Sequence, residues 1–139
     1  MDILQVLNNL RLLVVDDDAD TLELIRFIFE QHNAQVSSTV STTEAFRVIR
    51  LWKPDILISD IAMPIEDGCS FIRKVRSLKQ QEGQIPAIAL TALAAQEKLA
   101  LNGGFSTYMV KPFNPDDLVK LVANLALQKS FTLSPAAYD

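Results

Sequence analysis

Acidic, hydroxyl and amino side chains stand directly after short apolar runs in this chain. The carboxylates of Asp16 and Asp17 follow one run, and the carboxylate of Asp60 closes another. The hydroxyl of Thr91 and the amine of Lys111 each follow a further run. The runs themselves cover residues 11–15, 55–59, 86–90 and 107–110. Polar residues that recur in the same place indicate one site assembled from several segments.

Carboxylates that lie close together favour a cation as their partner. They repel one another, so a group of them needs positive charge. Oxygen ligands without His or Cys suit Mg²⁺, which proteins hold through one or two carboxylates with waters and a phosphate. An aspartate can also accept a phosphoryl group as an aspartyl-phosphate. Thr91 and Lys111 then offer a short hydrogen-bond donor and a compact positive charge for phosphoryl oxygens.

Buried runs and amphipathic stretches alternate along the chain, and this alternation predicts strands and helices in turn. We expect strands at residues 11–15, 34–38, 55–60, 86–90 and 107–110, and helices at about 19–32, 41–53, 68–78, 94–102 and 115–128. The pattern predicts an α/β fold of the (βα)5 kind, with a parallel sheet, right-handed crossovers and helices on both faces.

Capping signals mark where several helices begin. Ser41 with Glu44 forms a capping box, and Asp20 with Glu23 resembles one. Asn114 is a good N-cap before Pro115. The first helix is expected to bury Leu22, Ile25 and Phe29, with Leu24 and Ile28 widening the same face.

Parallel topology predicts where the polar residues meet. The carboxyl ends of all strands in a parallel sheet lie at one edge, and ligands of open α/β folds bind there. Asp16, Asp17, Asp60, Thr91 and Lys111 are therefore expected to converge at that edge.

Composition narrows the class of protein. The chain has 139 residues and a net charge of −4, which argues against direct nucleic-acid binding because phosphate contacts need a basic face. No apolar run approaches the ~20 residues that span a bilayer, and residues 1–10 do not look like a signal peptide. One cysteine, Cys69, permits no internal disulfide. We expect a cytoplasmic protein that does not enter the membrane.

Four motifs taken together resemble the receiver domain of two-component response regulators, the CheY-like family. They are Leu13-Val-Val-Asp-Asp17, Ile58-Ser-Asp-Ile-Ala-Met-Pro-Ile-Glu-Asp-Gly68, Ala89-Leu-Thr-Ala92 and Tyr108-Met-Val-Lys-Pro-Phe113. The resemblance runs over residues 11–128, in the right order along the chain. It implies a doubly wound, flavodoxin-like sheet with strand order 2-1-3-4-5.

The resemblance also implies a phosphorylation site. Asp60 is then the phosphoacceptor. Asp16, Asp17 and Asp60, with the backbone carbonyl of Ala62, are then the residues that hold Mg²⁺. The phosphoryl donor is a histidine kinase or a histidine phosphotransfer protein, and the chain is modified itself rather than turning over a separate substrate.

The remaining site residues are implied to read out that modification. Thr91 is the switch hydroxyl that moves to the phosphoryl group, and Tyr108 is the switch aromatic that moves inward with it. Lys111 pairs with the phosphoryl oxygens, and its bond to Pro112 is implied to be cis. A partner protein would bind the surface that changes on phosphorylation, and that partner could be a second copy of the chain in a homodimer.

The flanking segments are less informative. Residues 1–10 read as a linker or amino-terminal turn, 11–128 as the receiver domain and 129–139 as a loose tail. The run from Leu7 to Val15 resembles the junction that precedes the receiver of a hybrid sensor histidine kinase. A stand-alone regulator and a receiver from a longer protein both remain open.

Two positions depart from what rapid dephosphorylation needs. Ala62 and Leu93, each two residues beyond Asp60 and Thr91, have no side chain that can orient a hydrolytic water. We therefore expect a long-lived aspartyl-phosphate.

A second hypothesis is a haloacid-dehalogenase-like phosphohydrolase. Such an enzyme would use Asp16 with Asp18, two residues on, after its first strand. A later acid pair and a cap domain are missing from the sequence, and Asp18 by itself reads more simply as a helix cap. Labelling of Asp60 or of Asp16 would discriminate between the two hypotheses.

Overall fold

A computed structural model describes residues 3–62, 67–92 and 96–132. Over these residues the chain forms a five-stranded parallel sheet with strand order β2-β1-β3-β4-β5. The strands are β1 (Arg11–Val15), β2 (Gln35–Thr39), β3 (Ile56–Asp60), β4 (Ala87–Thr91) and β5 (Thr107–Val110). The predicted fold class and strand order are confirmed.

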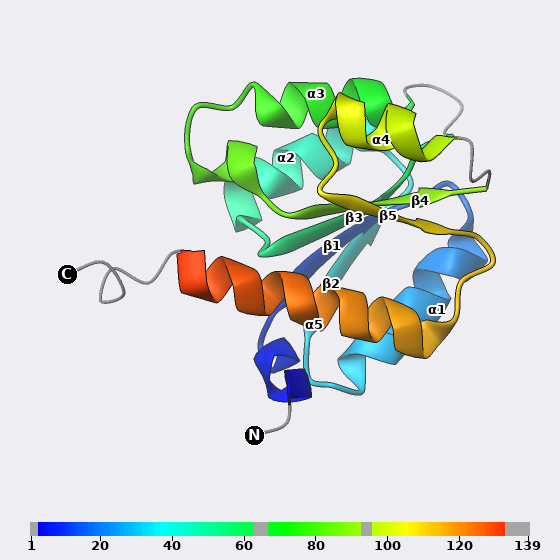
Figure 1. Cartoon of the computed structure of the whole chain (residues 1–139), viewed down its shortest axis with the longest axis vertical. Coiled ribbons are helices and arrows are strands. Elements are labelled where there is room, and N and C mark those ends of the chain that lie inside the picture. Colours follow the sequence, from blue (N-terminus) through cyan, green and yellow to red (C-terminus); the bar gives the residue numbers. More distant parts are fainter. Residues whose placement is uncertain (1–2, 63–66, 93–95, 133–139) are drawn as a thin grey trace.

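Five α-helices cover the two faces of this sheet (Figure 1). They are α1 (Ala19–Glu30), α2 (Thr42–Trp52), α3 (Gly68–Arg76), α4 (Glu97–Gly103) and α5 (Pro115–Thr132). α1 and α5 lie on one face, and α2, α3 and α4 lie on the other. Two short 3₁₀ helices, η1 (Ile3–Leu7) and η2 (Gln81–Gln84), complete the described elements.

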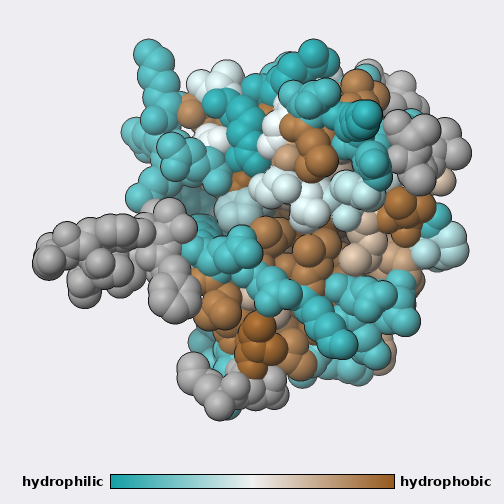
Figure 2. Space-filling model, viewed as in Figure 1, coloured by the Kyte–Doolittle hydropathy of each residue, from teal (hydrophilic) through white to brown (hydrophobic). Residues whose placement is uncertain are grey.

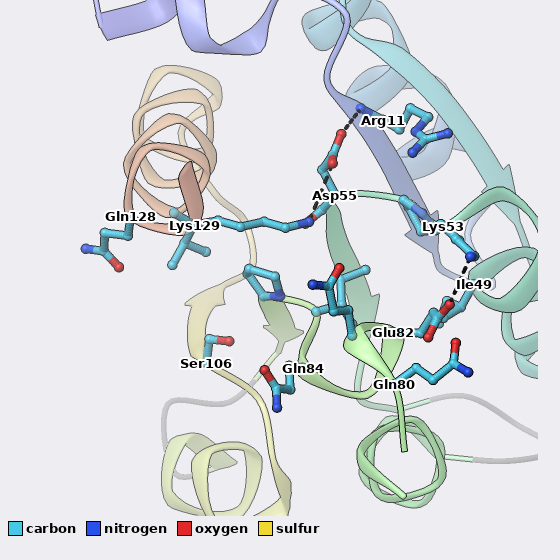
Figure 3. A pocket seen from close by; sticks show the side chains of 15 residues that line it. Arg11, Ile49, Lys53, Asp55, Gln80, Glu82, Gln84, Ser106, Gln128 and Lys129 are labelled. Atoms are coloured by element: carbon cyan, nitrogen blue, oxygen red, sulfur yellow. Dashed lines mark hydrogen bonds and ion pairs between the residues drawn. The ribbon is translucent and has the colours of Figure 1, made fainter. Parts of the chain in front are cut away.

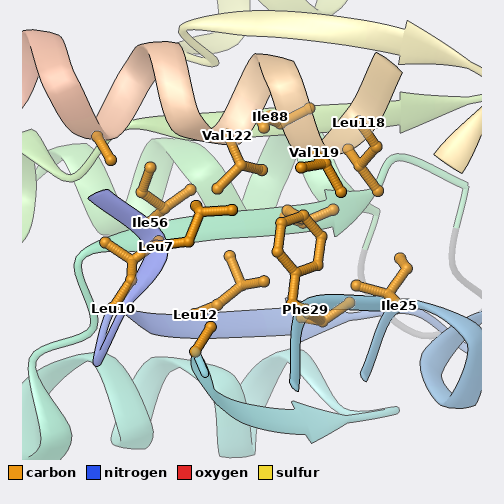
Figure 4. Close-up of a cluster of buried hydrophobic side chains, with 14 of the residues drawn as sticks. Leu7, Leu10, Leu12, Ile25, Phe29, Ile56, Ile88, Leu118, Val119 and Val122 are labelled. Carbon is orange, nitrogen blue, oxygen red and sulfur yellow. The ribbon is translucent and has the colours of Figure 1, made fainter. Parts of the chain in front are cut away.

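Each face of the sheet carries its own hydrophobic core, because alternate strand residues point to opposite sides. On β1, Leu12 and Val14 join the core under α1 and α5, whereas Leu13 and Val15 join the core under α2, α3 and α4. Figure 4 shows Phe29 of α1 pointing toward α5 within the first core. The first four residues of β3, Ile56–Ser59, are fully buried. A strand covered on both faces therefore delivers Asp60 to the sheet edge.

Local capping contacts largely match the sequence. The Ser41 hydroxyl accepts a hydrogen bond from the backbone N–H of Glu44, and the Asn114 side chain accepts from the backbone N–H of Asp116. The capping box predicted at Asp20 is wrong: Asp18 is the N-cap of α1, and its carboxylate accepts from the backbone N–H of Asp20. The helix begins one residue after Asp18, so the cap lies earlier than the Asp20–Glu23 pattern indicated.

Several other expectations need correction. Leu24 does not widen the buried face of α1, since 45% of it is exposed. The segment between the helix expected at 68–78 and the strand expected at 86–90 contains η2, and β2 lies one residue later than predicted. α5 continues to Thr132, so residues 129–132 are helical rather than part of a loose tail. The amino-terminal turn expected within residues 1–10, by contrast, is present: residues 3–7 form the short helix η1, whose Leu7 is fully buried in the core shared with α5.

The surface mixes hydrophilic and hydrophobic areas on the face that carries α5 (Figure 2). Single apolar side chains such as Leu127 on α5 and Leu101 on α4 are partly exposed. Among the described residues, no helix combines the length and the hydropathy that a membrane crossing requires.

The turn after Asp60 depends on a glycine. The backbone N–H of Gly68 donates to the carbonyl of Ile61 at 2.7 Å, which brings the start of α3 against the end of β3. A Cβ at residue 68 would lie 2.4 Å from the backbone oxygen of Asp60 and 2.8 Å from Cα of Ile61. Both neighbours are backbone atoms, so neither can move aside without shifting the strand end.

Gly68→Ala is expected to destabilise the protein by about 2–3 kcal/mol, because overpacking against backbone forces the helix and the strand apart. Urea denaturation measures the loss. Gly103→Ala is the matched control: its Cβ would meet its nearest neighbours, in Cys69 and Ile72, at 3.8 Å, which is ordinary contact. Equal stability of the Gly68 variant and wild type would contradict the close approach.

Candidate functional site

Three carboxylates meet at the carboxyl edge of the sheet, as parallel topology predicted. Asp16 directly follows β1, Asp17 is the next residue, and Asp60 is the last residue of β3. One carboxylate oxygen from each of them lies within 4.8 Å of the others. Asp16 is fully buried and Asp60 is 6% exposed, whereas Asp17 is exposed. The cluster is therefore open to solvent on the Asp17 side.

An amine from the far end of the chain reaches this cluster. Lys111 follows β5, and its Nζ lies 2.9 Å from Oδ2 of Asp16 and 3.5 Å from Oδ2 of Asp60. The backbone N–H of Lys111 donates to the carbonyl of Thr91 at 2.7 Å, which fixes the start of the loop between β5 and α5 next to the end of β4. The Lys111–Pro112 peptide bond is cis, as the resemblance implied. One ammonium thus bridges two buried carboxylates.

Burial and like charge act together on Asp60. Removal from water raises the pKa of the Asp60 carboxyl above its ordinary value, and the nearby carboxylate of Asp16 raises it further, against the opposing effect of Lys111. Burial lowers the pKa of Lys111, but hydrogen bonding and attraction to Asp16 and Asp60 outweigh it, so that the pKa is raised. The site thus holds Lys111 charged and makes the ionised form of Asp60 costly.

The donor set fits a hard divalent cation. The groups that converge are carboxylate oxygens, with no His or Cys in the cluster formed by the described residues. Mg²⁺ takes such oxygen ligands and keeps several waters, which suits a cluster with one exposed member. Asp16 and Asp60 would hold the ion on the buried side and Asp17 on the solvent side.

Two further predicted residues are held by the start of α4. The Thr91 hydroxyl donates to Oε1 of Gln96 at 2.5 Å, and the Tyr108 hydroxyl donates to the carboxylate of Glu97. Thr91 is completely buried, and it lies one residue beyond Leu90, the neighbour of Asp60 on β4. Sequence reasoning missed Gln96 and Glu97, because two polar residues at a helix start carry no signal of their own.

The two positions singled out for slow dephosphorylation are Ala62 and Leu93. The backbone N–H of Ala62 donates to Oδ1 of Asp60 at 3.3 Å, so this amide faces the carboxylate. Leu93 lies outside the described residues.

The carboxylate of Asp18 accepts from the Thr21 hydroxyl at 2.8 Å as well as from the amide of Asp20, which holds the pKa of Asp18 below its usual range. Asp18 therefore acts as a cap and does not join the cluster, which weakens the phosphohydrolase hypothesis.

A cavity of about 630 Å³ lies at the opposite edge of the sheet (Figure 3). Its lining combines residues just before strands, such as Asp55 and Ser106, with residues of α2, η2 and the carboxyl half of α5. Its charges bind one another: Nζ of Lys129 lies 3.5 Å from Oδ1 of Asp55, and Nζ of Lys53 lies 3.6 Å from Oε1 of Glu82. None of the residues that line this cavity belongs to the carboxylate cluster, so the cavity is separate from the candidate site.

Asp60→Asn is expected to raise the free energy of unfolding at neutral pH by about 1 kcal/mol, the scale of one partly screened charge. The pKa of Asp60 is higher in the folded protein than its ordinary value of 3.8. The protonated Asp60 carboxyl therefore favours the folded state fully below pH 3.8, and this stabilisation is lost as the pH rises through the folded-state pKa. The advantage of the variant should therefore grow with pH across that window. Urea denaturation from pH 4 to pH 7 without divalent ions measures it, and a constant difference would contradict the electrostatic cause.

The comparisons with known proteins agree on one family. The family model described as "Response regulator receiver domain" matches residues 12–123. A 14.6 kDa protein in the sodA1 3′ region of Leptolyngbya boryana is 42% identical over 89% of this chain and 95% of its own length. The transcriptional regulatory protein PrrA of Mycobacterium leprae is 31% identical over 91% of this chain, which spans only 54% of PrrA.

A solved structure has the same fold. The receiver domain of the Francisella response regulator 1452 superposes with a TM-score of 0.79 at 29% identity, over 87% of this chain and 99% of that one. The match thus extends from sequence to the arrangement of the sheet and helices.

Proposed function

The chain belongs to the family of response regulator receiver domains of two-component signalling, and from this premise we propose that Asp60 accepts a phosphoryl group from a histidine kinase or a histidine phosphotransfer protein. The main support for the proposal is the ion pair of Lys111 with Asp16 and Asp60 at the carboxyl edge of the sheet. A buried carboxylate ends β3, Nζ of Lys111 stands 3.5 Å from it, and two further aspartates complete a cation site. This arrangement can receive the negative charge of a phosphoryl group.

The proposed reaction moves one phosphoryl group between side chains. An oxygen of the Asp60 carboxylate attacks the phosphorus of a phosphohistidine on the donor. The P–N bond breaks as the P–O bond forms, and the imidazole of the donor takes up a proton from water. Lys111 and the backbone N–H of Ala62 already lie against Asp60, where they can bind phosphoryl oxygens. Mg²⁺ bound by the acidic cluster would neutralise charge on the phosphoryl group during transfer.

The proposed partners are proteins. The net charge of −4 gives this chain no basic surface excess for phosphate backbones, so we do not propose that it binds nucleic acid itself. We propose a cytoplasmic location, as membership of the response regulator receiver family implies. The chain is modified rather than acting as a turnover enzyme on a separate substrate.

The test is to find which residue is modified. The protein is incubated with acetyl phosphate with and without Mg²⁺, the acyl phosphate is trapped by reduction with borohydride, and peptides are mapped by mass spectrometry. We expect a Mg²⁺-dependent label on Asp60. A label on Asp16 would favour the phosphohydrolase hypothesis, and no label on any aspartate would overturn the proposed function.

We also propose that the aspartyl-phosphate is long-lived. The amide of Ala62 faces Asp60, but its methyl side chain has no group that can orient an attacking water. Ala62→Glu introduces such a group and is expected to shorten the lifetime several-fold. Decay of the label after removal of acetyl phosphate measures this. Rapid decay in wild type, within seconds in the presence of Mg²⁺, would contradict it.

A further inference from the structure

Thr91 and Tyr108, which the family resemblance implies to be switch residues, are both tethered to consecutive residues at the start of α4. Thr91 donates its hydroxyl proton to Oε1 of Gln96 at 2.5 Å, and Tyr108 donates to the carboxylate of Glu97. Gln96 is the N-cap residue of α4 and Glu97 is its first residue. The two tethers therefore join β4 and β5 to a single helical turn.

The other end of α4 is anchored to the scaffold. The backbone N–H of Phe105 donates to the carbonyl of Ala100 at 3.1 Å. Beyond the helix, Nε of Arg76 donates to the carbonyl of Gly104 at 2.8 Å, and the same guanidinium donates to the carbonyl of Ile85 at 2.6 Å. Through Arg76, these contacts hold the carboxyl end of α4 against α3 and near the segment that precedes β4. The amino end, by contrast, carries the contacts with Thr91 and Tyr108.

We propose that Gln96 and Glu97 are positioning residues that hold Thr91 and Tyr108 in the resting arrangement and thereby set how readily the receiver is activated. The inference rests on the proposed phosphorylation of Asp60. It adds a competing acceptor for each switch residue, and it assigns both acceptors to one turn of α4.

The physical basis is competition for a single proton. A threonine hydroxyl has one proton to donate. While that proton is directed at Gln96, it cannot be directed at a phosphoryl oxygen on Asp60. Phosphoryl oxygens are strong, charged acceptors and can displace a neutral amide oxygen. Thr91 is completely buried, so bulk water does not compete with Gln96 for its hydroxyl proton in the resting arrangement.

Tyr108 is held by a similar contact. Hydrogen bonding to Glu97 and the negative charge of that carboxylate raise the pKa of the Tyr108 phenol above its ordinary value. The phenol therefore stays neutral and remains a donor to Glu97. When Thr91 leaves Gln96, the same helical turn loses one of its two tethers, which favours release of Tyr108 from the other.

The test uses beryllofluoride as the probe and Tyr108 as the reporter. The chain has two tyrosines, so Tyr138→Phe leaves Tyr108 as the only site for 3-fluorotyrosine. A ¹⁹F NMR titration then gives the apparent affinity for beryllofluoride. Gln96→Leu removes the acceptor and is expected to tighten binding by about 3- to 10-fold, the equilibrium change that corresponds to one hydrogen bond. Gln96→Glu replaces the amide by a charged acceptor that competes more strongly for the Thr91 proton, and it is expected to weaken beryllofluoride binding rather than tighten it.

A double variant separates positioning from a general effect on structure. If Gln96 acts through the Thr91 hydroxyl, Gln96→Leu changes nothing in a Thr91→Val background. Glu97→Ala, in which Thr91 and Gln96 are intact, is expected to move the resting Tyr108 signal toward its beryllofluoride-bound position. Unchanged affinity in Gln96→Leu, or a change that persists without the Thr91 hydroxyl, overturns the proposal. Wild type that binds no beryllofluoride would instead overturn the phosphoacceptor function itself.

Discussion

Asp60→Asn protein is expected to take up the phosphoryl group of acetyl phosphate about 1,000-fold more slowly than wild type, or slower still. The carboxylate of Asp60 supplies the attacking oxygen, and an amide oxygen is a far weaker nucleophile. The side chains have nearly the same size, so the cluster around the site is preserved. Labelling with radioactive acetyl phosphate, followed by denaturing electrophoresis, measures the rate.

The control for this variant lies beside the same cluster. Asp18 is the exposed N-cap of α1, and Asn caps helices as well as Asp does. Asp18→Asn removes the same charge and is expected to retain wild-type labelling. Loss of labelling in Asp18→Asn with retention in Asp60→Asn would reverse the assignment and support the phosphohydrolase hypothesis.

Lys111→Met is expected to destabilise the protein by about 2–3 kcal/mol and to slow labelling by about 100-fold. Nζ of Lys111 lies 2.9 Å from a fully buried oxygen of Asp16 and 3.5 Å from an oxygen of Asp60. Methionine has a similar length but no charge, so two carboxylates would be left facing each other without a cation. The same cation can no longer bind the incoming phosphoryl oxygens.

Stability and labelling separate the two roles of Lys111. Mg²⁺ should restore part of the lost stability, since it supplies positive charge to the same carboxylates, but labelling should stay slow because the amine is absent. Urea denaturation with and without Mg²⁺ measures the first effect. Lys120→Met removes the same charge from the exposed surface of α5 and should change neither quantity. Wild-type labelling by Lys111→Met would contradict the role of its amine.

Local patterns in the sequence were enough to predict the five strands, the five α-helices and their order along the chain. Ser41 with Glu44 and Asn114 before Pro115 mark helix starts through bonds that span two or three residues, so spacing alone reveals them. Continuous apolar runs predicted strands buried on both faces, and parallel topology predicted which ends would meet. The carboxylates that converge at the sheet edge, together with Lys111, were among the residues so predicted. The capping box expected at Asp20 shows the limit of such local patterns, because neighbouring acids offer more than one possible cap; the competing prediction, Asp18 as the cap, is the one that is confirmed.

The contacts that these residues make could not be predicted from their spacing. The bridge from Lys111 to Asp16 joins residues 95 positions apart, and the contacts of Thr91 with Gln96 and of Tyr108 with Glu97 depend on where α4 sits against β4 and β5. The close approach of Gly68 to the backbone of Asp60 has the same origin. Distances of this kind follow from how rigid elements pack and from the rotamers that packing leaves open, and neither quantity is written in the spacing of residues along the chain.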